Sequence, residues 1–173
     1  LVFSSSCTVY GEPEQVPVKE STPTRPAASP YGATKQMGEV ILKDNKWFEV
    51  QCLRYFNPVG AHESSLIGEL PLGVPNNLIP YLTQTVAGIR PQLTVHGGDY
   101  NTPDGTCIRD YIHVMDLADA HVAAIGRLFS NPMEQKVEMG DPSLGNFEVF
   151  NIGTGKGYSV LEVISAFEAV TEQ

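Results

Sequence analysis

Three polar side chains in the first part of the chain are of the types that move a proton at a hydroxyl group. Ser6 follows a short apolar run, and Tyr31 and Lys35 stand four residues apart further along. Residues four apart in a helix share a face, which would bring the lysine ammonium close to the tyrosine ring. A tyrosine in water has a pKa of about 10, and a neighbouring positive charge favours the phenolate that a general base requires. An ordinary surface pair would show the same spacing, so the pattern alone leaves both interpretations open.

The hydrophobic pattern predicts the elements that would carry these side chains. Residues 1–3 predict a buried strand that ends in a serine-rich turn, so that Ser6 would lie just past its carboxyl end. A proline-rich loop follows, and Ser29 with Pro30 predicts the start of a helix that runs to about Asp44. Apolar side chains recur at helical spacing and predict the buried stripe of this helix, which consists of Met37, Val40 and Ile41.

Strands and helices alternate along the rest of the chain. Residues 49–56 predict a second strand, whose exit places Asn57 where Ser6 stands after the first. The alternation predicts an α/β fold with a parallel sheet, and ligands bind such sheets at the carboxyl ends of the strands. The other predicted elements are a loop at 60–78, a helix ending at Gly88, a strand at 92–97, a turn-rich segment at 99–114 with Asp104 and Gly105 at its tip, a helix at 116–129 capped by Asp116, a strand at 147–153 and a helix at 159–170.

Composition and charge argue against several classes of protein. The net charge is −9 and the lysines and arginines are scattered, which argues against nucleic acid as a partner. No apolar run approaches about 18 residues and no signal-peptide pattern is present, so we expect no membrane partner. Three distant cysteines without a C-x-x-C spacing support neither a zinc site nor a disulfide framework, and they favour the reducing cytoplasm. No metal is predicted, since the acidic and histidine residues at 113–121 lack ligand spacing.

The segment NIGTGKGYS, residues 151–159, follows a predicted strand and precedes a predicted helix, as a dinucleotide-binding turn does. Its glycines give G-x-G-x-G, however, and Tyr158 stands where the last glycine of that fingerprint belongs. The segment is therefore interpreted as the end of a strand followed by Ser159 as the cap of a helix.

Several longer motifs resemble a known family. The spacing S-x24-Y-x3-K from Ser6 to Lys35 is similar to the Ser/Tyr/Lys set of the extended short-chain dehydrogenase/reductase superfamily. The segments FSSSCTVYGEP, SPYGATK, LRYFNPVGAH, GVPNNLIPY and DGTCIRDYIHVMDLADAH resemble more closely the UDP-glucose 4-epimerase family, and this resemblance runs through nearly all 173 residues.

The resemblance implies a particular domain organisation. Residues 1–60 would be the C-terminal part of an NAD-binding Rossmann domain with its parallel sheet. Residues 61–173 would form most of a smaller, mixed α/β substrate-binding domain, with a strand at 147–152 returning to the Rossmann sheet. We expect the chain to be part of a longer protein, cut at both ends, because it begins without an initiator Met inside a predicted strand and stops on a predicted helix that has no cap. The glycine fingerprint for NAD, which lies near the N-terminus of the family, is not among these residues.

The resemblance also implies an activity, namely the NAD-dependent, reversible C4 epimerisation of UDP-glucose and UDP-galactose through a 4-keto intermediate, as part of galactose metabolism. Tyr31, Ser6 and Lys35 would be catalytic and would also bind the cofactor, and the complete enzyme would be a homodimer paired through the helix that carries Tyr31. The further cofactor positions are Tyr55, Phe56 and Pro58, and the UDP-hexose would contact Ser6, Tyr31, Asn57, Asn77, Leu78, Thr94, Val95, His96 and Arg109.

Two alternatives to this function, and one to the role of Arg109, stay open. A sugar-nucleotide 4,6-dehydratase would need a carboxylate beside the serine position, where Cys7 and Thr8 stand instead. The 173 residues alone would be a catalytically incompetent fragment or folding module, which binds NAD poorly. Arg109, which the resemblance assigns to the nucleotide diphosphate, would otherwise form a salt bridge with an acid such as Asp110.

Overall fold

Parallel pairing of three strands organises the first part of the structure. β1 (Val2–Ser6) pairs with β2 (Val50–Tyr55), and β2 pairs on its other side with β5 (Phe147–Ile152). The order β1-β2-β5 puts β2 in the centre, where residues 50–54 are all buried. The structure is a computed structural model that describes residues 1–130 and 146–171. The predicted α/β fold with a parallel sheet is confirmed.

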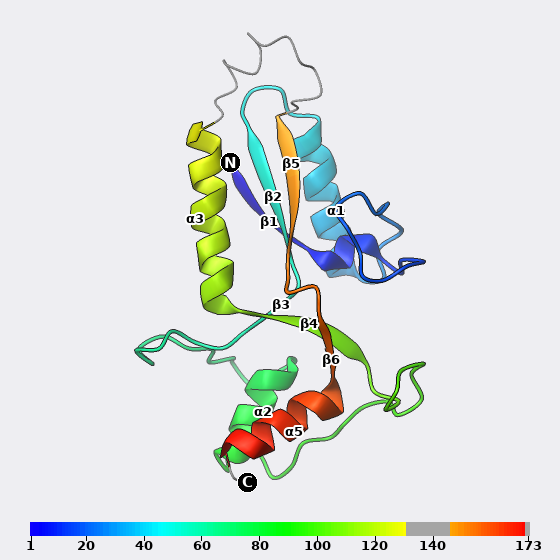
Figure 1. Ribbon diagram of the computed structural model, residues 1–173, viewed down its shortest axis with the longest axis vertical. Helices are drawn as coiled ribbons and strands as arrows, with labels where there is room; N and C mark the ends of the chain where they lie inside the picture. The colour runs from blue at the N-terminus through cyan, green and yellow to red at the C-terminus, as the bar shows by residue number, and fades with distance from the viewer. Residues whose placement is uncertain (131–145, 172–173) are drawn as a thin grey trace. The chain divides into compact units, whose positions relative to one another are not determined.

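Two helices cover opposite faces of this sheet (Figure 1). Successive side chains of a strand point to opposite faces, so Arg54 of β2 reaches Glu39 of α1 (Pro30–Lys43). Gln51 of the same strand instead donates to Glu148, which pairs with Arg127 of α3 (Val114–Ser130). With a short 3₁₀ helix at Cys7–Tyr10, these elements form unit 1, residues 1–56 and 115–153. Its fully buried apolar side chains are Val9, Tyr10, Val50, Cys52 and Leu53.

The start of α1 follows the prediction. Ser29 is the N-cap, its side chain accepts a hydrogen bond from the Gly32 N–H at 3.1 Å, and Pro30 is the first helical residue. The helix is also packed closely against its neighbours. A Cβ on Gly38 would lie 2.5 Å from the tip of the Phe3 ring, and one on Gly32 would lie 3.2 Å from the Thr8 carbonyl oxygen.

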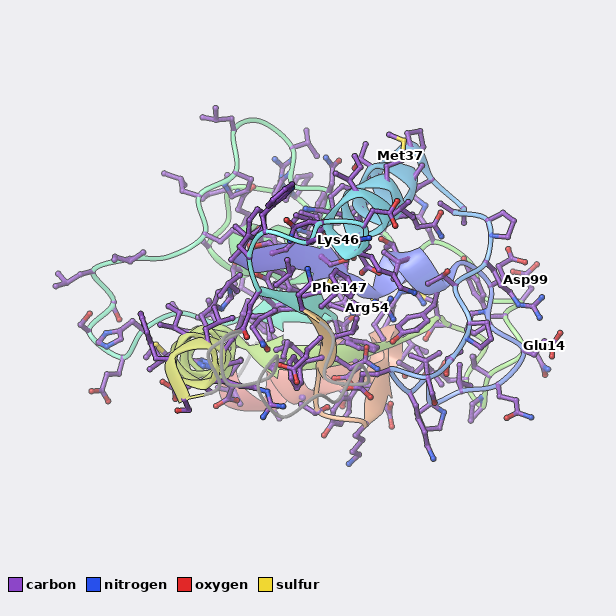
Figure 2. The ribbon with its side chains drawn as sticks, turned by 90° about the horizontal axis from the view of Figure 1, so that it is seen from above. Glu14, Met37, Lys46, Arg54, Asp99 and Phe147 are labelled. Atoms are coloured by element: carbon purple, nitrogen blue, oxygen red, sulfur yellow. The ribbon has the colours of Figure 1, made fainter. Side chains whose placement is uncertain are left out.

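The predicted buried stripe of α1 is wrong. Met37, Val40 and Ile41 are 59%, 62% and 69% exposed, whereas Gly32 and Glu39 are the buried residues of the helix. Figure 2 shows Met37 on the outside of α1 and Arg54 among the strands beneath it. Helical spacing identifies an apolar face but not what covers it, and no described residue covers this one.

The predicted serine-rich turn after residue 3 is also wrong, because all three serines belong to β1. Ser4, Ser5 and Ser6 stand opposite Leu53, Arg54 and Tyr55 in the parallel register. Serine is a common turn residue, but here the ladder with β2 satisfies the backbone and side-chain partners satisfy the hydroxyl groups. The chain turns only at the 3₁₀ helix that follows.

A second, mixed sheet organises unit 2, residues 57–114 and 154–173. β3 (Asn57–Val59) pairs parallel with β4 (Ile108–His113), and β4 pairs antiparallel with β6 (Gly157–Ser159). The unit also holds α2 (Leu78–Val86) and α5 (Val160–Thr171). Ser159 caps α5 as predicted, because its hydroxyl accepts from the Glu162 N–H while the Glu162 carboxylate accepts from the Ser159 N–H.

Three predictions within the later part of the chain are wrong. Residues 92–97 form no strand, since strand-forming residues need a ladder partner and none lies beside them in the described residues. Conversely, residues 108–113 form β4, whose partners are distant in sequence and could not be read from the turn residues before it. Helix α3 begins at Val114, so Asp116 lies in its first turn and is not its cap.

Candidate active site

Ser6, Tyr31 and Lys35 all belong to unit 1, where the end of β1 lies against α1. Ser6 is the last residue of β1, and its Oγ accepts a hydrogen bond from the Thr8 N–H at 3.3 Å. Tyr31 is the second residue of α1, and the Lys35 Nζ lies 5.4 Å from the centre of its ring. The same ammonium donates to the Ser4 carbonyl at 2.8 Å, which ties the helix to the strand that carries Ser6.

The Tyr31 side chain is 55% exposed. Within residues 1–130 and 146–171, its hydroxyl group forms no hydrogen bond with the protein. The Lys35 cation lies beside the ring of the phenol, and the phenol oxygen is left available to a ligand. This is the arrangement that proton exchange with a bound hydroxyl group requires.

Tyr55, at the end of β2, is held on the face of the sheet that α3 covers. Its hydroxyl lies 2.7 Å from Ser4 Oγ and 2.7 Å from His121 Nε2. His121 Nδ1 lies 2.7 Å from the Leu117 carbonyl and donates to it, because a carbonyl can only accept. Burial raises the pKa of Tyr55, and negative charge on Tyr31 or Cys52 would raise it further. Tyr55 is therefore a neutral hydrogen-bonding side chain at neutral pH.

The next two residues of interest lie on either side of the boundary between the units. Phe56 directly follows β2 in unit 1, and its N–H donates to the Ile152 carbonyl at 3.0 Å. Asn57 opens β3 in unit 2, and its side-chain amide donates to the Asp110 carbonyl at 2.7 Å. Pro58 follows it and is exposed.

The remaining predicted substrate residues all lie in unit 2. Asn77 is the N-cap residue of α2 but makes no side-chain cap bond, and Leu78 is the first residue of that helix. Thr94, Val95 and His96 lie in an irregular segment. Arg109 is exposed on β4, and its Nη1 donates to the Ile108 carbonyl at 2.9 Å.

Asp110 does not form the salt bridge that was the alternative partner for Arg109. Its carboxylate accepts from the Thr154 N–H at 2.9 Å, the Thr154 hydroxyl at 2.7 Å and the Gly155 N–H at 2.8 Å. No ion pair joins Arg109 to an acid anywhere in the described ranges. In the described residues of unit 2, no acidic side chain is therefore paired with the guanidinium of Arg109.

Sequence reasoning missed an ion pair beneath the candidate site, Glu39 with Arg54. Both residues are buried, at 7% and 5% exposure, and they join α1 to β2. The indication was present in the sequence, because Glu39 stands four residues after Lys35 and eight after Tyr31, on the same face of the helix.

The described residues hold neither a cluster of metal ligands nor a helix suited to span a membrane. No group of three or more histidine, cysteine, aspartate or glutamate side chains in that part of the chain could hold a metal ion. Among the helices described, none combines the length and the apolar character needed to cross a membrane.

Comparison with known proteins shows which family this chain belongs to. Residues 1–140 match the model of the NAD dependent epimerase/dehydratase family, so the chain is a member of that family. It is 53% identical over 176 residues to a UDP-glucose 4-epimerase of Neisseria gonorrhoeae, covering 99% of this chain and 48% of the relative. It is 54% identical to UDP-glucose 4-epimerase GEPI48 of Cyamopsis tetragonoloba, with 97% and 45% covered. The chain thus spans about half the length of the curated relatives it matches.

A solved structure of a UDP-glucose 4-epimerase is also similar to this chain. The crystal structure of UDP-glucose 4-epimerase from Bifidobacterium longum, in complex with NAD+ and UDP, superposes with a TM-score of 0.87 and 47% identity. The match covers 99% of this chain and 48% of that one.

Proposed function

We propose that this chain supplies the catalytic residues of an NAD-dependent enzyme that interconverts UDP-glucose and UDP-galactose by inversion at C4 of the hexose. One observation carries the proposal: Tyr31 is exposed, and the Lys35 ammonium that lies 5.4 Å from its ring is also bonded to the Ser4 carbonyl of β1. The names of relatives that are about half identical to this chain support the choice of reaction. A role in galactose metabolism belongs to the same proposal.

The residues present fit the part of NAD that reacts. Polar side chains and a cation stand at the carboxyl ends of parallel strands, which is where nucleotide cofactors bind in open α/β sheets. Ser6, Tyr31, Lys35, Tyr55, Phe56 and Pro58 would hold the cofactor. When bound, it supplies a hydride acceptor and donor for C4 of the sugar. The 173 residues contain no glycine fingerprint for its pyrophosphate, so we expect them to be inactive by themselves.

The protein groups then have separate tasks at the 4-hydroxyl of the sugar. The Tyr31 oxygen takes the proton of this hydroxyl as the 4-keto sugar forms, and returns it when the opposite face of C4 has been reduced. The Ser6 hydroxyl hydrogen-bonds the same sugar oxygen and aligns it. Lys35, whose ammonium is held by the Ser4 carbonyl, keeps a positive charge beside the phenol while the proton moves.

We propose that unit 2 binds the nucleotide part of the substrate. Arg109 is exposed and without an acidic partner in the described residues, and arginine is suited to a diphosphate. By the same proposal, residues 1–60 are the C-terminal part of an NAD-binding domain, and residues 61–173 are most of a substrate-binding domain from which β5 returns to the first sheet. The other proposed substrate contacts are Asn57, Asn77, Leu78, Thr94, Val95 and His96.

The test is a UDP-galactose to UDP-glucose assay on the natural polypeptide that carries these residues, at its full length. Replacing Tyr31→Phe removes the hydroxyl alone, and we expect turnover to fall by about 10²–10⁴ because general acid–base catalysis contributes that much. Tyr100→Phe is the matched control, since Tyr100 is 52% exposed like Tyr31 and is not one of the proposed site residues. Near-normal turnover in Tyr31→Phe would contradict the proposed mechanism. A 4-keto-6-deoxy product from the unaltered protein would favour a dehydratase instead.

We also propose that two copies of the protein pair through the exposed apolar face of α1. Ala33, Gln36, Met37, Val40 and Ile41 line a shallow groove on this face, and a charge placed there should keep the copies apart. Val40→Glu is therefore expected to convert a dimer to a monomer in analytical ultracentrifugation, and an unchanged sedimentation coefficient would count against this face. The cytoplasmic location stays a prediction from the cysteine spacing.

A further inference from the structure

A cluster of buried polar side chains lies beneath the candidate active site in unit 1, between α1 and the sheet. It consists of Glu39 on α1, Ser5 on β1, and Cys52 and Arg54 on β2. All four are buried, and the proposed mechanism uses none of them.

The carboxylate of Glu39 is the centre of this cluster. Arg54 meets it with two nearly parallel hydrogen bonds, Nε to Oε1 at 2.9 Å and Nη2 to Oε2 at 2.6 Å. Ser5 Oγ donates to Oε1 at 2.5 Å, and the Cys52 thiol donates to the same oxygen at 3.3 Å. A single side chain of the helix is thus fastened to two neighbouring strands by four contacts.

These contacts keep the pair charged although it is out of water. Burial by itself would raise the pKa of Glu39, but the hydrogen bonds from Arg54 and Ser5 and the charge of Arg54 outweigh it and hold that pKa below its ordinary value. Burial also raises the pKa of the Cys52 thiol to about 12, so Cys52 acts only as a hydrogen-bond donor.

The position of the cluster links it to the proposed chemistry. Ser5 directly precedes Ser6, and Arg54 directly precedes Tyr55. Glu39 lies one helical turn beyond Lys35 and two beyond Tyr31, on the same face of α1. The carboxylate therefore sets how far along β1 and β2 the helix can sit, and with it the place of Tyr31 relative to Ser6.

We propose that Glu39 and Arg54 are positioning residues for the Tyr31, Lys35 and Ser6 group, an inference that rests on the proposed epimerase function. A buried ion pair is weak evidence of a role in stability, because apolar residues of similar volume often stabilise a fold as well or better. Apolar residues cannot replace the two parallel hydrogen bonds between the guanidinium and the carboxylate. These bonds fix both the distance of α1 from β2 and the rotation of the helix about its axis.

The surroundings of Arg54 also favour arginine over lysine. The flat guanidinium stacks on the Tyr10 ring, with Cζ 4.7 Å from its centre, while the Tyr10 hydroxyl donates to Asn151 of β5 at 2.7 Å. A lysine would keep the charge near Glu39 but lose the fork and the stacking.

Two sets of variants in the full natural polypeptide separate positioning from stability. Glu39→Leu with Arg54→Met replaces the pair by apolar side chains, and Arg54→Lys keeps the charge without the fork. We expect the double variant to unfold at or above the wild-type temperature, yet both sets should lower kcat by about 10–100-fold, with KM for the UDP-sugar changed much less. Arg127→Met is the control, since it breaks the exposed ion pair of α3 with Glu148 on the other face of the sheet and should leave kcat unchanged.

A kcat within about twofold of wild type in the double variant would overturn the proposal, because a displaced catalytic group lowers the rate by much more than twofold. If the double variant does not fold, Arg54→Lys decides the question by the same criterion. If the wild-type protein has no epimerase activity, the proposed function fails, and the pair is tested by crystal structures of wild type and Arg54→Lys instead. A distance between the Tyr31 and Ser6 hydroxyl groups that changes by about 1 Å supports the positioning role, and an unchanged distance overturns it.

Discussion

The contact between Gly38 of α1 and Phe3 of β1 allows a prediction in which two effects of known size oppose each other. Gly38 lies inside the helix, where replacement by alanine would ordinarily stabilise the protein by about 1 kcal/mol. The added Cβ, however, would lie 2.5 Å from Cζ of Phe3 and 3.2 and 3.3 Å from the two adjoining ring carbons. These distances are too short for carbon atoms, so the ring or the helix must move.

Overpacking of this kind costs about 1–3 kcal/mol. Set against the gain of about 1 kcal/mol in helix propensity, Gly38→Ala should destabilise the protein by up to about 2 kcal/mol. Activity should fall as well, because the Phe3 ring lies 5.7 Å from the Lys35 ammonium and cannot shift without disturbing it.

Gly126 of α3 provides the matched control, since it also lies within a helix but has no atom within 4 Å of an added Cβ. Urea unfolding of the full natural polypeptide should show Gly126→Ala stabilised by about 1 kcal/mol, and the two variants should differ by about 1–3 kcal/mol. Adding Phe3→Leu to Gly38→Ala shortens the clashing side chain and should recover part of the loss. Equal stabilisation by Gly38→Ala and Gly126→Ala would refute this reasoning, since it would mean that α1 and β1 are not in close contact at Gly38.

Two further predictions concern the anchoring of α1. Because the pKa of Glu39 is held below its ordinary value of 4.5 in the folded protein, its contribution to stability is present above about pH 4.5 and is lost as the pH falls through the lower, folded value. The gap in unfolding free energy between wild type and Glu39→Gln should therefore be widest at neutral pH and narrow in acid, and a gap independent of pH in urea titrations would argue against an ionised Glu39. Ser29→Ala removes the cap on the Gly32 N–H and should cost about 1 kcal/mol in the same assay, whereas Ser29→Asp, which caps equally well, should cost little.

Local signals predicted the elements that carry the candidate site. The Ser29-Pro30 start of α1, the strand at β2, the helix stop near Gly88 and the cap at Ser159 were all confirmed, because capping and helix termination depend on residues close together in the chain. The strand at 92–97 failed for the opposite reason, since a strand exists only where another strand pairs with it. β4 was missed on the same ground, because its partners β3 and β6 lie about 50 residues away on either side.

The amino-acid sequence by itself determined the membership of the family, the parallel α/β class and the identity of Ser6, Tyr31 and Lys35 as candidates, because these depend on residue types at fixed spacings. Only the tertiary structure decided which face of α1 is buried. Periodicity favoured the apolar stripe of Met37 and its neighbours, but the helix turns Glu39 inward to meet Arg54 on a strand fifteen residues away. A charge can be buried only when its partner is in place, and that partner is supplied by folding rather than by spacing along the helix.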